Sequence, residues 1–190
     1  MPNKWRDHIR RSGELKVHNL AGKWSPSVNN AIRLFNGLGF GVKLVNSPEL
    51  AGAHIVVKLS TQNADSYTHK VGRDEYVISV NFDANGVHGK ARTLVEQNRQ
   101  GPEIFFAAVF LPGKRNTVNS LKEMIIVHEF IHAAGMNEDH DASGIMADTM
   151  SVIGNTFVEI KGAAPMPPIR VGGKTMCLMR DLWTGEACES

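Results

Sequence analysis

Residues 128–136 read HEFIHAAGM, and this stretch decides more about the fold than any other part of the chain. It places His128 and His132 four residues apart, with Glu129 directly after the first histidine. On a helix this spacing brings both imidazoles to one face, one turn apart, where they can hold one metal ion. A catalytic zinc ion takes three protein ligands and keeps one position open for water. The stretch therefore predicts a third ligand further along the chain.

The two histidines lie at the end of the best-defined helix that the sequence predicts. Ser120 and Glu123 fit a capping box, in which each side chain accepts a hydrogen bond from a backbone N–H near the other residue. Gly135 stands where helices commonly end in the left-handed conformation. The apolar residues that share a face with both histidines are Leu121, Met124, Ile125 and Ile131. A metal bound by these histidines would lie at the rim of the core, within reach of water.

The stretch HEFIHAAGM, followed by SGIMAD at 143–148, resembles the metzincin clan of zinc metallopeptidases. These enzymes carry an H-E-x-x-H-x-x-G signature and a Met-turn downstream. In this resemblance Gly135 matches the glycine at which the chain turns back toward the metal. Met146 matches the methionine that forms a floor beneath the zinc ion, so the resemblance implies a Met-turn at Met146.

The resemblance extends more loosely to other parts of the chain. In architecture it covers 14–150: a helix with Trp24 near its start, then VKLVNS at 42–47 and GAHIVVKLS at 52–60, is similar to matrixin-like domains before their edge strand. The stretch GMNEDHD at 135–141 is similar to small metzincin-like proteins of tailed phages. The resemblance implies an α+β fold of the zincin type, with a twisted mixed sheet of about five strands, an active-site helix, a second helix, a Met-turn and a short C-terminal helix. The length of 190 residues indicates one domain over 1–190.

The third ligand has three candidates in a row. The usual metzincin pattern puts it three residues after the glycine, where this chain has Glu138, and Asp139 and His140 follow at once. We favour His140, because imidazole suits zinc and a loop carries this ligand, so that two additional residues are easily accommodated. Glu138 and Asp139 stay open as alternatives.

The resemblance implies a zinc-dependent endopeptidase that takes Zn²⁺ at His128, His132 and His140. Glu129 would act as the general base that removes a proton from the attacking water. The substrate would be a protein or peptide that adds in extended form to an edge strand. Residues 87–96 are the candidate for that strand, and His88 would then line the cleft.

Three other functions remain open. The chain could be a structural or assembly protein, for example of a virus particle, that keeps a zinc site without catalysis. It could hydrolyse another amide, such as the peptide cross-links of bacterial cell walls. A calcium loop is disfavoured: an EF-hand requires glycine at its sixth position, where this chain has Ala142. The alternating residues that suggest calcium are Asn137, Asp139, Asp141 and Ser143.

The remaining segments predict an open mixed sheet with a helix on one face. Ser25 would cap the helix at 25–39, and 87–96 would pair back on 75–82 across a turn at 83–86. The predicted strands are 14–19, 42–47, 54–60, 75–82 and 103–112. A linker-like stretch at 162–170 leads to a predicted short helix at 174–183.

Composition narrows the class of protein. Hydrophobic residues make up 42% and charged residues 21%, which is typical of soluble globular proteins, and a net charge of +2 gives no reason to expect a nucleic-acid partner. No apolar run approaches the ~18 residues that span a membrane, and no secretory signal is visible, so we expect a cytoplasmic or virion-associated protein. Cys177 and Cys188 are then expected to be reduced. His18, His54 and His69 have no ligand spacing.

Overall fold

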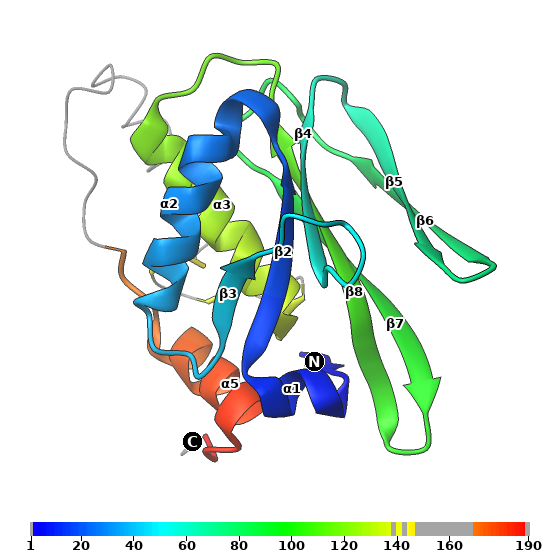
Figure 1. The fold of residues 1–190 in the computed structure, drawn as a ribbon. Coiled ribbons are helices and arrows are strands. Elements are labelled where there is room, and N and C mark those ends of the chain that lie inside the picture. Colours follow the sequence, from blue (N-terminus) through cyan, green and yellow to red (C-terminus); the bar gives the residue numbers. More distant parts are fainter. Residues whose placement is uncertain (1, 138–139, 142–143, 147–168, 189–190) are drawn as a thin grey trace.

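The computed structural model describes residues 2–137, 140–141, 144–146 and 169–188. Within these residues the fold is α+β, as predicted, and its centre is a mostly parallel sheet (Figure 1). The order β1-β8-β4-β2-β3 is parallel throughout, and β7 adds antiparallel to β8. These strands are β1 (Lys4–Trp5), β2 (Glu14–Leu20), β3 (Lys43–Asn46), β4 (Ile55–Ser60), β7 (Lys90–Asn98) and β8 (Gly101–Pro112).

The strands follow from the distribution of apolar residues. In β2 the side chains of Leu15 and Val17 are buried whereas Lys16 between them is exposed, which is the alternation of a strand with one face on the core. β8 is buried continuously from Phe106 to Pro112 because both faces of this strand are covered. All five predicted strands are present in the structure, within one to two residues of the expected bounds.

Helices cover one face of the sheet. α2 (Ser25–Asn36) and α3 (Asn119–Ile131) pack against each other in front of the sheet, and α5 (Gly173–Thr184) lies near the end of α3 (Figure 1). Two short helices, α1 (Asp7–Ser12) and η1 (Gly22–Trp24), also occur in the described part of the chain, and η2 (His132–Met136) continues α3 as a wide π-helical turn. The main core fills the space between these helices and the sheet.

A β-hairpin covers part of the opposite face of the sheet. It consists of β5 (Ala64–Val71) and β6 (Asp74–Asn81), of which the sequence predicted only the second. Ile78 and Val80 are buried there with Phe106 and Phe110 of β8 in a second core cluster. The ring of His69 stacks on Phe106 with 3.6 Å between the ring centroids.

Three local predictions were wrong. β7, at 90–98, pairs with β8 and not with 75–82, although the turn at 83–86 is present, with Gly86 N–H bonded to Asp83 O over 2.9 Å. Ser25 does not cap α2, because it is already the first helical residue. The capping box is also absent: α3 begins at Asn119, one residue before Ser120.

Side chains at these helix starts have other partners. The carboxylate of Glu123 accepts a hydrogen bond from Asn30 Nδ2 over 2.9 Å, which links α3 to α2. The serine and the glutamate of the predicted box therefore do not stabilise each other. The box motif identified the helix but placed its N-cap two residues too late, at Ser120 and not at Val118.

The two cysteines are joined, contrary to the expectation of reduced thiols. A disulfide connects Cys177 in α5 with Cys188, eleven residues further on. In the part of the chain that the structure describes, no helix has the length and apolar character to cross a membrane. The linker-like stretch at 162–170 lies, except for its last two residues, outside the described residues.

Candidate metal centre

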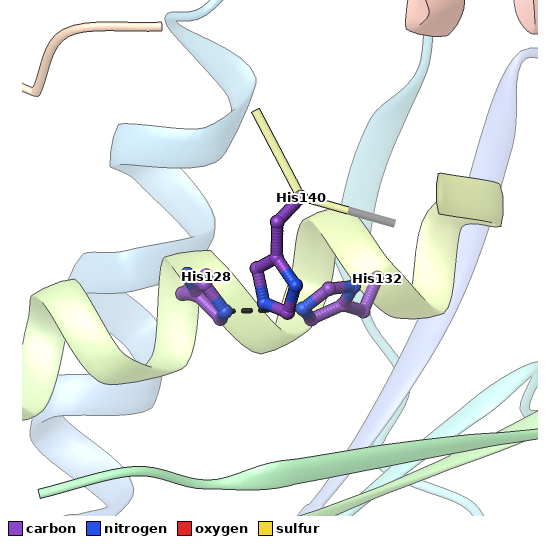
Figure 2. Close-up of side chains that lie close together, drawn as sticks. All are labelled: His128, His132 and His140. Atoms are coloured by element: carbon purple, nitrogen blue, oxygen red, sulfur yellow. Dashed lines mark hydrogen bonds between the residues drawn. The ribbon is translucent and has the colours of Figure 1, made fainter. Parts of the chain in front are cut away.

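Three histidines converge at the end of α3. His128 lies in the last turn of α3, His132 begins η2, and His140 follows in the loop (Figure 2). One ring nitrogen of each residue lies within 4.8 Å of the ring nitrogens offered by the other two. The Nε2 atoms of His128 and His132 are 3.0 Å apart. This cluster could hold a metal ion, and among the described residues it is the one group of three or more His, Cys, Asp or Glu side chains that could do so.

The surroundings of His128 fit a zinc ligand. Its Nδ1–H donates a hydrogen bond to the carbonyl oxygen of Ile145 over 2.7 Å, in a buried contact. A proton on Nδ1 leaves the lone pair of Nε2 directed at the other two histidines. Histidine ligands in metal sites commonly use this arrangement, in which the second ring nitrogen is fixed by a carbonyl oxygen.

The surroundings of His132 favour a neutral imidazole. Burial, together with the nearby rings of His128 and His140, lowers its pKa to about 3. A metal ligand must present an unprotonated nitrogen, so this environment removes the competition between proton and metal at neutral pH. The donor set of three imidazoles is therefore chemically suited to zinc.

Gly135 explains how the chain leaves the helix. Its φ of 133° lies in the region that L side chains rarely adopt, and a Cβ there would be 2.9 Å from the carbonyl oxygen of Asn3. The prediction of a helix end near this glycine is confirmed in part: Gly135 is non-helical, but the π-helical turn that contains it ends one residue later, at Met136. The loop then brings His140 over the pair formed by His128 and His132.

The side chain of Glu129 lies against the start of strand β7. Its side chain is buried, and its carboxylate accepts a hydrogen bond from the backbone N–H of Ala91 in β7. Burial raises the pKa of Glu129 to about 8, against the opposing effects of Lys90, the Ala91 N–H and Arg92. The carboxyl group therefore lies between helix α3 and strand β7, beside the three imidazoles.

A cavity of about 190 Å³ opens at this place. The start of β7 forms one wall, and α3 with the loop beyond it forms the other. The lining residues are His88, Gly89, Lys90, Ala91, Arg92, His128, Glu129, His132, Asn137 and His140. The cleft thus contains His88, as the sequence suggested, and the candidate substrate strand 87–96 borders the metal centre.

Sequence reasoning missed several residues of this cleft. Lys90 and Arg92 lie in the candidate strand 87–96 but carry no motif of their own, and Asn137 was considered only as a calcium-loop position. Gly89 did carry a signal, because a glycine within a strand often marks a close approach by another group. A Cβ at Gly89 would be 2.7 Å from Cγ of Glu129.

Of the remaining predicted site residues, Met146 is fully buried, and its carbonyl oxygen accepts the N–H of Asp141 over 3.0 Å. Glu138 and Asp139, the alternative third ligands, lie outside the described residues. Two of the calcium-loop positions, Asp139 and Ser143, also lie outside them, and Asp141 bonds instead to Thr175.

The other histidines are engaged elsewhere. His54 Nδ1 accepts the backbone N–H of Lys16 over 3.0 Å, and His18 Nδ1 lies 3.0 Å from Ser47 O. His69 stacks on Phe106. The expectation that these three would not join the metal group is consistent with these positions.

No protein-family model matches the chain, and no curated protein matches it.

Proposed function

We propose that this chain is a zinc-dependent endopeptidase of the metzincin type, with Glu129 as general base. The observation that carries the proposal is the junction of three elements at one cavity. Three histidines form a group that could hold a metal ion, a buried carboxylate lies next to them, and an antiparallel strand borders the cavity. Each element matches one requirement of peptide hydrolysis.

His128, His132 and His140 would hold the zinc ion. When bound, zinc supplies Lewis acidity, which lowers the pKa of water toward neutrality and polarises a carbonyl oxygen. The protein contributes the orientation of the ligands. The carbonyl oxygen of Ile145 fixes the ring of His128, and burial keeps His132 neutral.

A zinc ion next to Glu129 would favour its ionised form over the protonated form that burial favours. The carboxylate would then take the proton from the attacking water and deliver it to the amine nitrogen that leaves. The N–H of Ala91 holds the carboxylate at the wall of the cavity, which fixes its position relative to the histidines. A base that is positioned before the substrate binds loses little entropy in the reaction. Glutamine at this position would keep the shape of the side chain but could not accept the proton.

Strand β7 would bind the substrate. Among the described residues it pairs with β8 alone, so β7 forms a border of the main sheet next to the cavity. An extended peptide can add to such a border through backbone hydrogen bonds. This placement supports a protein or peptide as substrate, with the bond to be cut beside the histidines.

The test compares zinc content and peptide hydrolysis in matched variants. We expect about one zinc per chain in untagged wild-type protein by elemental analysis, and cleavage of an unfolded protein such as denatured casein. Glu129→Gln should keep the zinc and lose at least 100-fold in activity. His140→Ala should lose both.

Each other outcome identifies a different alternative. Loss of zinc in Glu138→Ala or Asp139→Ala, with zinc retained in His140→Ala, would transfer the third ligand to that residue. Zinc without cleavage of denatured protein but with cleavage of purified cell wall would change the substrate class. Zinc without any hydrolysis would favour the structural or assembly role, for example in a virus particle.

A further inference from the structure

The loop that carries His140 is attached to the first turn of α5. Asp141, the residue after His140, is buried, and one of its carboxylate oxygens accepts two hydrogen bonds from Thr175. The backbone N–H of Thr175 donates over 2.8 Å and its hydroxyl over 2.9 Å. A buried carboxylate with such partners fixes the loop, because releasing it would leave polar groups without hydrogen bonds.

We propose that Asp141 is a positioning residue of the metal centre: its bond to Thr175 holds the loop that places His140 opposite His128 and His132. The inference depends on zinc binding, as the proposed function does, but it does not depend on peptide hydrolysis.

Two further contacts join the same loop to its surroundings. Lys174 Nζ donates to the carbonyl oxygen of His140 over 3.2 Å, so the residue that offers the ligand is itself held by α5. The backbone N–H of Asp141 donates to Met146 O over 3.0 Å. Contacts with α5 and with Met146 therefore hold both His140 and the residue after it.

The segment before α5 also fixes a second ligand. The N–H of Ile145 donates to Arg170 O over 2.7 Å, and the carbonyl oxygen of Ile145 accepts the Nδ1–H of His128. Gly144 makes this approach possible: its φ is +75°, and a Cβ there would be 2.6 Å from Arg170 O. Residues 170–175 thus organise both His128 and His140.

The position of Thr175 explains why its partner, Asp141, carries a carboxylate. Thr175 is the third residue of α5, and the first N–H groups of a helix have no partner within it. No side chain at Gly172 caps this helix, so Asp141 supplies the acceptor from outside, where the helix dipole also favours a negative charge. A cap of this kind could serve stability alone, and the experiment must separate stability from ligand placement.

The experiment measures the zinc dissociation constant at neutral pH by competition with a chromophoric chelator. It also measures the melting temperature of the metal-free protein. The variants are Asp141→Ala, Asp141→Asn and Thr175→Val. The matched control is Leu44→Ala, which removes a buried side chain from β3, whose pairing partner is β2. The control shows how far general destabilisation alone weakens zinc binding.

We expect Asp141→Ala to weaken zinc binding 10- to 100-fold, the usual effect of losing a partner of a metal ligand. Asp141→Asn, which keeps an acceptor oxygen, should bind zinc within about fivefold of wild type, and Thr175→Val should lie between the two. Leu44→Ala should lower the melting temperature of the metal-free protein and leave the zinc constant within about threefold.

Equal zinc affinity in Asp141→Ala and wild type, with a lower melting temperature in the metal-free variant, would overturn the inference and leave Asp141 as a helix cap. If Asp141→Ala does not fold, Thr175→Val decides by the same criterion. A wild-type protein that binds no zinc would overturn both this inference and the proposed function. A wild type that binds zinc but hydrolyses nothing would leave this inference intact.

Discussion

The side chain of Glu129 lies directly against the backbone of Gly89. An added Cβ at Gly89 would be 2.7 Å from Cγ of Glu129 and 2.9 Å from the carbonyl oxygen of Phe110. Real Cβ atoms essentially never approach other atoms so closely, so strand β7 can lie beside the glutamate only because residue 89 has no side chain. The strand proposed to bind substrate and the proposed general base are therefore in direct contact.

Gly89→Ala should impair catalysis without removing the metal. The methyl group must displace either the carboxylate or β7, and we expect at least a tenfold fall in kcat/KM with zinc content unchanged. The free energy of unfolding should fall by about 1–3 kcal/mol, the usual cost of overpacking. Peptide hydrolysis, elemental analysis and urea unfolding measure the three quantities.

Gly37→Ala is the matched control for that variant, because its φ is −76° and the nearest contact of an added Cβ is 3.4 Å. It should change neither activity nor zinc content. An active Gly89→Ala enzyme would show that the contact with Glu129 does not matter for the position of the carboxylate.

Removal of zinc should lower the melting temperature. A ligand that binds only the folded state stabilises it by about 2.7 kcal/mol at 100 times its dissociation constant. In a chain of this size that corresponds to roughly 5–10 °C. Scanning calorimetry with a chelator, and again after zinc is restored, measures the shift. Identical melting temperatures would contradict binding at His128, His132 and His140.

His54 should make stability depend on pH below neutrality. Burial, together with the charges of Lys16 and His8, lowers its pKa from an ordinary value of about 6.5 to about 4. Between these values the unfolded chain binds a proton that the folded protein does not, so stability falls as the pH decreases from 6.5 to 4. We expect a loss of about 1–2 kcal/mol, less than the full shift implies, because the ring is partly exposed.

Urea unfolding of the metal-free protein across this pH range measures the effect. His54→Asn is the control, since the Asn oxygen can accept the N–H of Lys16 in place of Nδ1 but does not titrate. The difference in pH dependence between wild type and His54→Asn gives the contribution of His54 alone, because the histidines of the candidate metal centre are the same in both proteins. Parallel pH profiles would contradict the prediction.

Two tryptophans should stabilise the turn after His132. Trp5 Nε1 donates to Ala133 O over 3.0 Å, and Trp183 Nε1 donates to Ala134 O over 3.1 Å, both in buried contacts. Replacing either tryptophan by phenylalanine leaves a buried carbonyl without its donor, which costs about 1–3 kcal/mol.

Trp24→Phe is the control, because the indole N–H of this buried residue has no hydrogen-bond partner among the described residues. It reports the loss of packing without the loss of a hydrogen bond. Urea unfolding should therefore give a lower free energy of unfolding for Trp5→Phe and Trp183→Phe than for Trp24→Phe. Equal stability of the three variants would show that the indole bonds contribute little.

Local patterns in the sequence predicted most of the elements. The alternation in β2, the continuous apolar run of β8 and the helical period of α3 depend only on which face of each element is buried. The cluster of His128 and His132 follows from helix geometry alone. Helix starts were less predictable, because Ser25 and Ser120 fit N-cap preferences but are the first residue of α2 and the second residue of α3.

Contacts between distant segments could not be predicted. Strand β6, the expected partner of 87–96, pairs with β5, and β7 pairs with β8 instead. The bond between Asp141 and Thr175 spans 34 residues and leaves no periodic pattern. His140 was preferred because of ligand chemistry, and spacing alone gave no reason to choose it over Glu138 or Asp139.

The two indole bonds at the turn after His132 also set an order of events during synthesis. One donor lies 128 residues before its acceptor, and the other lies 49 residues after its acceptor. A growing polypeptide therefore cannot complete this turn until residue 183 has left the ribosome. Metal uptake by the nascent chain would then depend on the arrival of α5, and a stalled fragment ending before α5 would hold the histidines without the support that orients them.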